Sequence, residues 1–206
     1  MVSRVFDAEV AEVWRHLSSA KAWAWSVLVG QKASIPEAAG VYTWTWGEEL
    51  WYIGQAAGQD GLRGRIGDEH LRAGYLESRQ KKWPPGHFQR SCPTTTVRSG
   101  KAAIDQSYFR LDLADRLRLA PGMGTPTMDG TLSFIIEHLS VRWATIANLA
   151  MTTPIEVRLI ELHCPVLNKR HNIRYIGCPG GRCPITPREA AYRRSRAQVE
   201  GSSVGT

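Results

Sequence analysis

The most informative run of apolar positions lies between Gly40 and Gly54. This stretch is rich in β-branched and aromatic residues, opens and closes on glycine, and is broken by the polar run 47–49, so it predicts a β-hairpin. Because side chains along a strand alternate between faces, Tyr42 and Tyr52 share a face only if the loop has an odd number of residues or a bulge corrects the parity. Packing of these aromatic residues in an ordinary core would also explain the pattern.

Helical periodicity marks three further segments. Apolar residues recur at helical spacing over 6–29, over 102–119 and from Thr153 to the residues before Pro165. The segment 140–146 alternates instead and predicts a third strand. Together these segments indicate an α+β fold, in which helices flank a small, central, mostly antiparallel sheet of three strands.

The chain divides into three parts. Residues 1–34 are a helical appendage, 35–170 the main domain and 171–206 a basic C-terminal extension. Within the main domain, 73–131 has little periodicity and many loop signals, which predicts an insertion that serves target selection. A length of 206 residues favours one elaborated domain over two.

Three blocks of the main domain form a distinctive constellation. Gly40–Tyr42 (GVY) precedes Tyr52–Gly54 (YIG) by nine residues, Leu62–Arg65 follows, and Glu156 stands twelve residues before Asn168 in a segment that reads Glu-x-x-Leu-Ile and then Pro-x-Leu-Asn. These blocks resemble the motifs of the GIY-YIG nuclease superfamily, with valine in place of the first isoleucine. The resemblance covers about residues 35–170.

The resemblance implies a role for each matched residue. Tyr42 would be the general base, Tyr52 would position water or assist proton transfer, Arg65 would clamp the scissile phosphate, Glu156 would hold the metal, and Asn168 would orient neighbouring groups. A single carboxylate is consistent with one divalent ion, Mg²⁺ or Mn²⁺, held also by water and the substrate phosphate. Because a free tyrosine titrates at about pH 10, a tyrosine base needs a positive charge beside it.

Two positions near Arg65 have alternative interpretations. Arg63 competes for the phosphate-binding role, and His70 is either a helper of the base or a surface histidine. In an α-helix residues five apart are separated by about 500°, so Arg65 and His70 would not share a face, whereas Arg63 and His70, seven apart, would.

Glu156 also has a purely structural interpretation. Thr153 is a good N-cap and Pro154 suits the first helical position, so Glu156 would complete a capping box by bonding back to the backbone of Thr153. The helix alone favours this capping role, whereas the full set of motifs favours the metal-binding role.

The charge of the chain favours a polyanionic partner. The formal net charge is +7 and the pI is about 9.5, which points to nucleic acid before membrane. From Lys169 to Arg196 the chain has eight basic residues and a single acidic one, Glu189. Lys169 and Arg170 follow the last motif, and we expect them to contact nucleic acid. The rest of the basic extension is either a solvated tail or a phosphate-contacting arm.

Cysteine usage and hydropathy indicate a cytoplasmic protein with no membrane partner. The sequence has four cysteines but no signal-peptide pattern and no apolar run long enough to cross a membrane, so a disulfide framework is not expected. Cys178 and Cys183 form half of a zinc site at best, with His163, Cys164 and His171 as further ligands, and the Pro-Gly-Gly between them is also explained by a tight turn.

Two functions follow from these observations. The first is a metal-dependent DNA endonuclease, a phosphodiester hydrolase with a restriction, mobile-element or repair role. A palindromic target would require two active sites, and so either a homodimer or sequential nicking. The second is a nucleic-acid-binding module that keeps the fold without cutting. The two differ in whether Tyr42, Tyr52, Arg65 and Glu156 converge.

Overall fold

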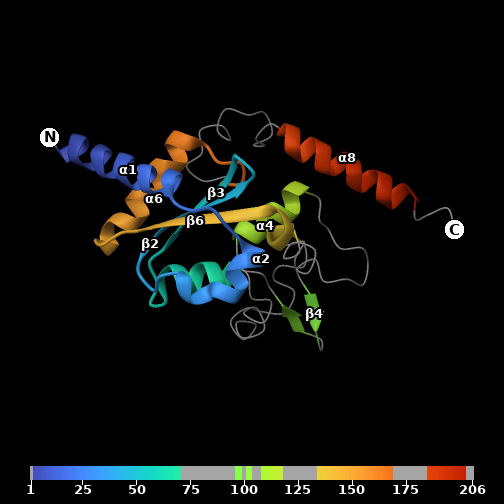
Figure 1. The fold of residues 1–206 in the computed structure, drawn as a ribbon, viewed down its shortest axis with the longest axis horizontal. Helices are drawn as coiled ribbons and strands as arrows, with labels where there is room; N and C mark the ends of the chain where they lie inside the picture. Colours follow the sequence, from blue (N-terminus) through green and yellow to red (C-terminus); the bar gives the residue numbers. More distant parts are fainter. Residues whose placement is uncertain are drawn as a thin grey trace.

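The computed structural model describes residues 2–70, 96–98, 101–103, 108–117, 134–168 and 185–202 (Figure 1). The strands are β1 (Trp23–Ala24), β2 (Gly40–Trp46), β3 (Glu49–Ala56), β4 (Thr96–Arg98), β5 (Lys101–Ala103) and β6 (Leu139–Thr145). The helices are α1 (Val2–Ser19), α2 (Trp25–Leu28), the 3₁₀ helix η1 (Val29–Ser34), the π-helix η2 (Arg63–His70), α4 (Tyr108–Leu117), the 3₁₀ helix η4 (Leu149–Met151), α6 (Thr152–His163) and α8 (Pro187–Ser202).

The main sheet confirms the α+β class. Its strand order is β1-β6-β2-β3, and every neighbouring pair is antiparallel. The prediction of three strands was wrong by one, because the two residues of β1 pair with Ser140 and Val141 on the outer edge of β6. β1 falls inside the segment 6–29 that was predicted as one helix. The helix expected over 102–119 begins at Tyr108, because Lys101–Ala103 pairs with β4 in a separate two-stranded sheet.

A β-bulge sets the faces of the hairpin formed by β2 and β3. Trp46 pairs with Glu49, so the turn contains two residues, of which Gly47 has a φ of +59°. The register shifts between Trp44 and Thr45, so that Trp44 pairs with Tyr52 and Tyr42 with Gly54. The bulge therefore corrects the parity, and both tyrosines lie on one face, one of the two outcomes that the sequence allowed.

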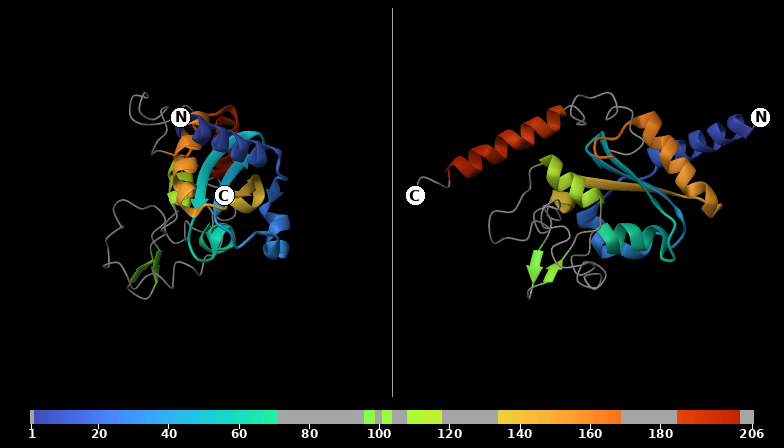
Figure 2. Two further views of the ribbon diagram at one scale, coloured as in Figure 1. Left: turned by 90° about the vertical axis from the view of Figure 1, so that its left-hand side faces the viewer. Right: turned by 180° about the vertical axis from the view of Figure 1, so that it is seen from behind.

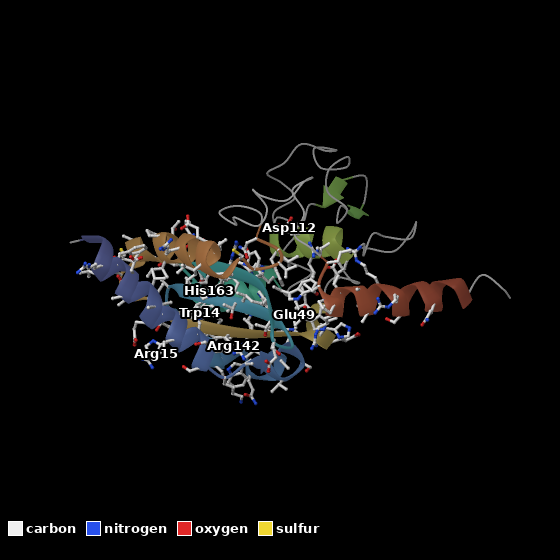
Figure 3. The ribbon with its side chains drawn as sticks, turned by 90° about the horizontal axis from the view of Figure 1, so that it is seen from above. Trp14, Arg15, Glu49, Asp112, Arg142 and His163 are labelled. Atoms are coloured by element: carbon white, nitrogen blue, oxygen red, sulfur yellow. The ribbon has the colours of Figure 1, made fainter. Side chains whose placement is uncertain are left out.

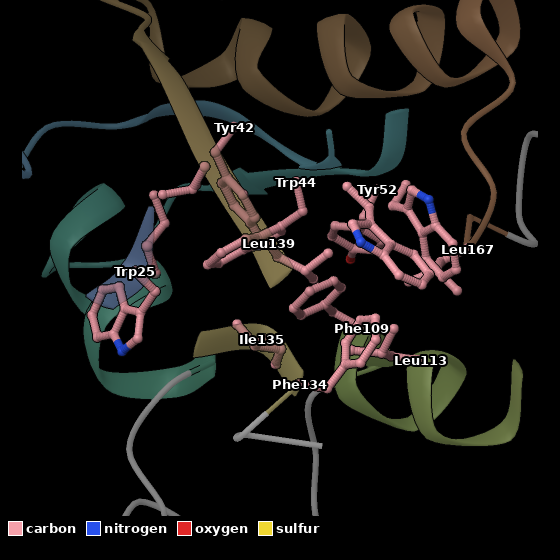
Figure 4. Packing of buried hydrophobic residues seen from close by; sticks show 14 of the residues in the cluster. Trp25, Tyr42, Trp44, Tyr52, Phe109, Leu113, Phe134, Ile135, Leu139 and Leu167 are labelled. Carbon is pink, nitrogen blue, oxygen red and sulfur yellow. The ribbon is translucent and has the colours of Figure 1, made fainter. Parts of the chain in front are cut away.

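Each face of the sheet has its own apolar core. Tyr42, Trp44 and Tyr52 pack with residues from α2, η2 and α4, as Figure 4 shows for Phe109 and Leu113. On the opposite face, α1 and α6 lie side by side and cover Val41 and Ile53 (Figure 2). The chain thus forms helical layers on both sides of the sheet, and the aromatic layer contains the tyrosines of the motif.

The two terminal helices extend from opposite sides of the sheet. α1 packs its apolar side on the face of the sheet that carries Val41 and Ile53. α8 runs away from the sheet toward the C-terminus (Figures 1 and 2). Among the described helices, none has both the length and the apolar character needed to cross a membrane.

Candidate active site

A buried hydrogen bond joins the first tyrosine of the motif to His70. Tyr42 Oη lies 2.6 Å from His70 Nε2, and neither side chain has exposed surface. The Tyr52 ring stands 6.3 Å from the Tyr42 ring and 6.4 Å from the His70 ring, measured between centroids. His70 is therefore a buried partner of Tyr42, and the surface interpretation of this histidine was wrong.

The glycines of the two tyrosine motifs are required by close packing. A Cβ at Gly54 would lie 2.4 Å from Tyr42 Oη and 2.7 Å from Tyr52 Cε1. A Cβ at Gly40 would lie 2.2 Å from the carbonyl oxygen of Ala144 on β6. Gly54 therefore leaves room for both phenol rings, and Gly40 lets β2 approach β6.

The π-helical geometry of η2 changes which residues share a face. Hydrogen bonds in a π-helix join residues five apart, so Arg65 and His70 lie one turn from each other on one side of η2. The sequence expectation assumed an α-helix and separated them. Leu62 and Ile66 on the same segment are buried in the aromatic core. From this position His70 bonds to Tyr42 on β2, and the charge of Arg65 acts on Tyr52 on β3.

Arg63 has a structural role. Its Nε donates to Ile35 O at 2.8 Å, and its other nitrogens bond to Ala33 O and to the Glu37 carboxylate. These bonds tie η2 to the segment that leads into β2. Arg65 is instead the arginine whose charge acts on Tyr52 and Glu156, because it lowers the pKa of both groups.

Glu156 stands beside the same tyrosine. Burial raises the pKa of its carboxyl from an ordinary 4.5 to about 7, although the Arg65 guanidinium and the backbone amide of Gln55 both lower it. Gln55 lies on β3, three residues after Tyr52, so these contacts place the Glu156 carboxyl over the end of β3 that follows Tyr52. α6 therefore brings a half-buried carboxylate to the tyrosine motif from across 100 residues of sequence.

The capping box predicted for Glu156 was wrong. α6 begins at Thr152, and the residue before it, Met151, makes no side-chain capping bond. The 3₁₀ turn η4 runs directly into α6 and is itself capped by Asn148, whose Oδ1 accepts from Ala150 N at 3.1 Å. Thr153 is consequently inside the helix, and Glu156 lies beyond the position from which it could cap.

The surroundings of Tyr52 favour its neutral phenol. Burial raises its pKa well above 10, the nearby Tyr42, Glu156 and Asp112 raise it further, and Arg65 opposes them. A neutral phenol donates a hydrogen bond, which is the property that the positioning role expected for Tyr52 requires.

Asn168 fixes the backbone next to Tyr52. Its Nδ2 donates to Ile53 O at 2.8 Å and its Oδ1 accepts from Ile53 N at 2.9 Å. Leu167 N donates to Trp51 O at 2.8 Å, so residues 166–168 continue the hydrogen bonding of the sheet along β3. Asn168 thus holds the backbone of Ile53, the residue after Tyr52, which agrees with an orienting role.

Helix α4 of the insertion supplies two residues that the motifs did not predict. The Phe109 ring is stacked on Trp44 and lies 5.0 Å from the Tyr52 ring and 5.2 Å from the His70 ring. Asp112, one turn later on α4, acts on the pKa of Tyr52 (Figure 3). The helical periodicity of 102–119 predicted an apolar stripe there, but nothing in the sequence indicated which surface the stripe would cover.

The donor set fits a divalent cation held by one protein carboxylate. In the described part of the chain, no group of three or more His, Cys, Asp or Glu side chains is gathered as a metal site would require. Glu156 offers one hard oxygen donor, and Mg²⁺ commonly takes one or two carboxylates and completes its shell with water and phosphate. Glu156 therefore fits a site with one protein carboxylate. The described residues do not form a closed cage of several protein ligands.

The other predicted residues lie either outside the described part of the chain or at the end of α6. Lys169, Arg170, Cys178 and Cys183 lie outside the described residues, so the nucleic-acid and zinc predictions that rest on them stay predictions. Cys164 is a free, buried cysteine at the left-handed end of α6, and its thiol contacts Glu161 O. The adjacent His163 is stacked on Trp14 of α1 at 3.5 Å (Figure 3). It serves packing between α1 and α6.

Comparisons with known proteins found no family model, curated protein or solved structure that matches this chain.

Proposed function

We propose that this protein is a GIY-YIG-type endonuclease that hydrolyses DNA phosphodiester bonds with the help of one divalent cation. The observation that supports the proposal best is the convergence of Tyr42, Tyr52, Arg65, His70 and Glu156, which come from β2, β3, η2 and α6. Ordinary core packing does not need a charged arginine and a carboxylate beside two buried phenols, since burying charge is costly.

Hydrolysis of a phosphodiester needs a base for the attacking water and positive charge on the phosphoryl oxygens. Tyr42 takes the proton from water and passes its own proton across the 2.6 Å bond to His70 Nε2. Arg65 binds the scissile phosphate through the fixed fork of its guanidinium. Tyr52 donates a hydrogen bond that orients water, and Asn168 holds the strand that carries Tyr52.

Glu156 would hold the cation. A bound Mg²⁺ or Mn²⁺ would supply positive charge that stabilises the developing negative charge on the phosphate. Between cleavage events, the Arg65 guanidinium and the Gln55 amide keep the carboxylate of Glu156 in place.

Cleavage of supercoiled plasmid tests the proposal. Purified wild-type protein is expected to nick or linearise the plasmid with Mg²⁺ and to leave it intact with EDTA. Glu156→Gln should be inactive while it still binds DNA. Glu161→Gln is the matched control, because Glu161 lies on the same helix in a half-exposed pair with Arg158, away from the tyrosine motif. Equal activity of wild type and Glu156→Gln would contradict the metal-binding role.

A non-cleaving nucleic-acid-binding module is the second candidate. It is favoured by the complete burial of Tyr42 and His70, which keeps the proposed base away from solvent in this structure. This candidate predicts that wild-type protein binds plasmid and branched duplexes without cutting either, with or without Mg²⁺.

The role in restriction or repair and the homodimer belong to the same proposal. Cutting both strands of a palindromic target at once needs two active sites. Sedimentation of the protein with a cleaved duplex would show two copies per duplex, whereas one copy that nicks strands in sequence would argue for a monomer.

A further inference from the structure

A row of aromatic side chains crosses the sheet on the face of the candidate active site, with one side chain from each strand. Trp23 lies on β1, Trp143 on β6, Tyr42 on β2 and Tyr52 on β3. Trp143 is the register partner of Tyr42, and directly paired residues of antiparallel strands point to the same face. All four belong to one apolar core or pack against it. The row therefore runs from the tyrosine motif to β1, the strand at the edge of the sheet.

The two tryptophans of this row form a stacked pair. Their ring centroids lie 6.0 Å apart, and their planes differ by 15°. Trp23 pairs with Val141, two residues before Trp143, so the tryptophans are diagonal neighbours, a separation that large aromatic rings can bridge. Both keep part of their surface exposed, whereas the tyrosines of the row are buried. The row thus ends in two accessible indoles beside the buried phenols.

The backbone that carries Trp23 is fixed in place. Both residues of β1 pair with β6. Just before β1, Arg142 Nε donates to Ala20 O at 3.1 Å and ties this segment to the same strand. The residue that follows β1, Trp25, is buried in the core. The pair is therefore formed before any ligand arrives, and preorganisation of this kind reduces the entropy lost on binding.

A lysine supplies positive charge at the pair. Lys21 is exposed, and its Nζ stands 3.8 Å from the centroid of the Trp23 ring. An ammonium over an indole is attracted by the ring quadrupole, but the contact is weak where water competes for the charge. A ligand that joins a flat ring to an anion would bind better, because its ring would replace the ammonium on Trp23 and its anion would attract Lys21. A nucleotide has this chemistry.

We propose that Trp23, Trp143 and Lys21 form a stacking site for an unpaired base of the DNA substrate, with Lys21 on the adjoining phosphate. Every base has a π-face, and proteins that hold single strands combine aromatic side chains with positive charge. In a duplex the neighbouring bases cover these faces, so the site selects single-stranded or branched segments, or a base turned out of the helix. The inference rests on the proposed nuclease function and names its substrate class. Because Trp143 adjoins Tyr42, the unpaired nucleotides lie next to the cleaved bond.

Affinity for DNA with and without an unpaired base tests the site independently of cleavage. Fluorescence anisotropy would measure binding of the Glu156→Gln protein to three labelled DNAs: a blunt duplex, the same duplex with a single-stranded tail, and the tailed duplex with abasic sites in the tail. Trp23→Leu and Trp143→Leu, each added singly, are compared with Trp14→Leu. Trp14 is the matched control, because it is also half-buried and stacked, but on His163 across the sheet.

One stacked base contributes about 5- to 150-fold to affinity. We expect Trp23→Leu and Trp143→Leu to weaken binding of the tailed duplex by a factor in this range and to leave the blunt duplex unchanged. Neither variant should lose more affinity when the tail is abasic, since the base that would stack is already absent. Trp14→Leu should bind all three DNAs as the Glu156→Gln protein does.

The salt dependence of binding tests Lys21 separately. If Lys21 contacts one phosphate of the single strand, Lys21→Gln lowers the slope of log Kd against log salt by about 0.7 on the tailed duplex. Arg4→Gln, which removes one charge from an exposed position of α1, should leave the slope unchanged. Equal slopes for the two variants would remove Lys21 from the site.

The remaining outcomes overturn the proposal in distinguishable ways. If the Glu156→Gln protein binds the tailed and abasic-tailed duplexes equally, no base stacks on the pair; this comparison needs no tryptophan variant to fold. If Trp23→Leu and Trp143→Leu weaken all three DNAs alike, the pair serves only to close the edge of the sheet. Plasmid cleavage by wild type would leave the nuclease proposal standing in both cases. If wild type cuts no DNA and the Glu156→Gln protein binds none, the nuclease proposal and the stacking site fail together.

Discussion

At the scale of single residues, Glu156 makes the stability of the protein depend on pH. Its folded pKa of about 7 lies above the ordinary 4.5, so between these values the folded state binds more protons than the unfolded state. Its contribution to stability is therefore lost as pH rises from 4.5 to 7 and stays lost above. Two and a half pKa units correspond to about 3 kcal/mol.

Glu156→Gln removes this dependence. The free energy of unfolding of the variant minus that of wild type should be about 2–3 kcal/mol larger at pH 8 than at pH 5, because the buried amide carries no charge at either pH. Urea unfolding at the two pH values measures the difference. Glu161→Gln, which removes a half-exposed carboxylate from the same helix, should show a smaller change. If wild type and Glu156→Gln lose the same free energy of unfolding between pH 5 and pH 8, burial of the Glu156 carboxylate does not destabilise the folded state.

Metal binding should offset the cost of the buried Glu156 carboxylate. At a Mg²⁺ concentration of 100 times Kd, a cation that binds only the folded state stabilises it by about 2.7 kcal/mol. We expect this gain for wild type at pH 8 and its loss on adding EDTA, with Na⁺ at equal ionic strength giving no gain. Glu156→Gln should lose the Mg²⁺ effect and Glu161→Gln should retain it. Stabilisation of both variants alike would place the metal elsewhere.

Gly54 tests the close packing of the two phenols. A methyl group there would lie 2.4 Å from Tyr42 Oη, so Gly54→Ala must displace Tyr42 and break its bond to His70. Overpacking of this kind costs about 1–3 kcal/mol. Gly30→Ala is the control, since its Cβ would have no neighbour within 4 Å. Thermal unfolding and plasmid cleavage should both fall for Gly54→Ala alone, and a fully active Gly54→Ala would contradict the assigned role of Tyr42.

At the scale of elements, α4 positions His70 through Phe109. Phe109→Ala should cost about 3–5 kcal/mol through the cavity it leaves and should loosen the His70 ring. Phe6→Ala is the control, because Phe6 packs on the opposite face of the sheet. The imidazole resonances of His70 and the pH profile of cleavage should change for Phe109→Ala and not for Phe6→Ala. If His70 is unaffected in both variants, α4 serves only to fill the core.

Local patterns predicted the strands better than they predicted the site. The β-branched and aromatic residues around Tyr42 and Tyr52 predicted the hairpin, and side-chain parity left two turn geometries that would put both tyrosines on one face. The spacing from Glu156 to Asn168 indicated two residues that both bond to the backbone of β3, at Gln55 and at Ile53. The sequence around Arg65 carries no local signal for the π-helix, which lies beside Leu62 and Ile66 where both are buried in the aromatic core. Phe109 and Glu189 depend on contacts across long stretches of chain, which periodicity does not specify.

At the scale of the whole molecule, the ion pairs of the buried Glu189 with Arg116 and Arg193, the Glu189 cluster, decide whether α8 moves with the body. Glu189→Gln leaves Arg116 and Arg193 facing a neutral amide, and breaking a buried pair of this kind costs about 3–5 kcal/mol. Since α8 contributes only the partly buried Tyr192 to the two apolar cores, we expect the loss to appear as local opening of the helix. Amide exchange over 187–202 should accelerate about 100-fold or more, while exchange in β2 and β3 stays slow.

Glu161→Gln provides the comparison for this experiment as well, because an exposed pair contributes at most about 1 kcal/mol. If Glu189→Gln speeds exchange throughout the sheet, α8 is part of the cooperative core, and its anchor stabilises the whole fold. If exchange changes only in α8, the helix opens as a separate unit while the sheet stays folded, and the Glu189 cluster serves to hold α8 on α4.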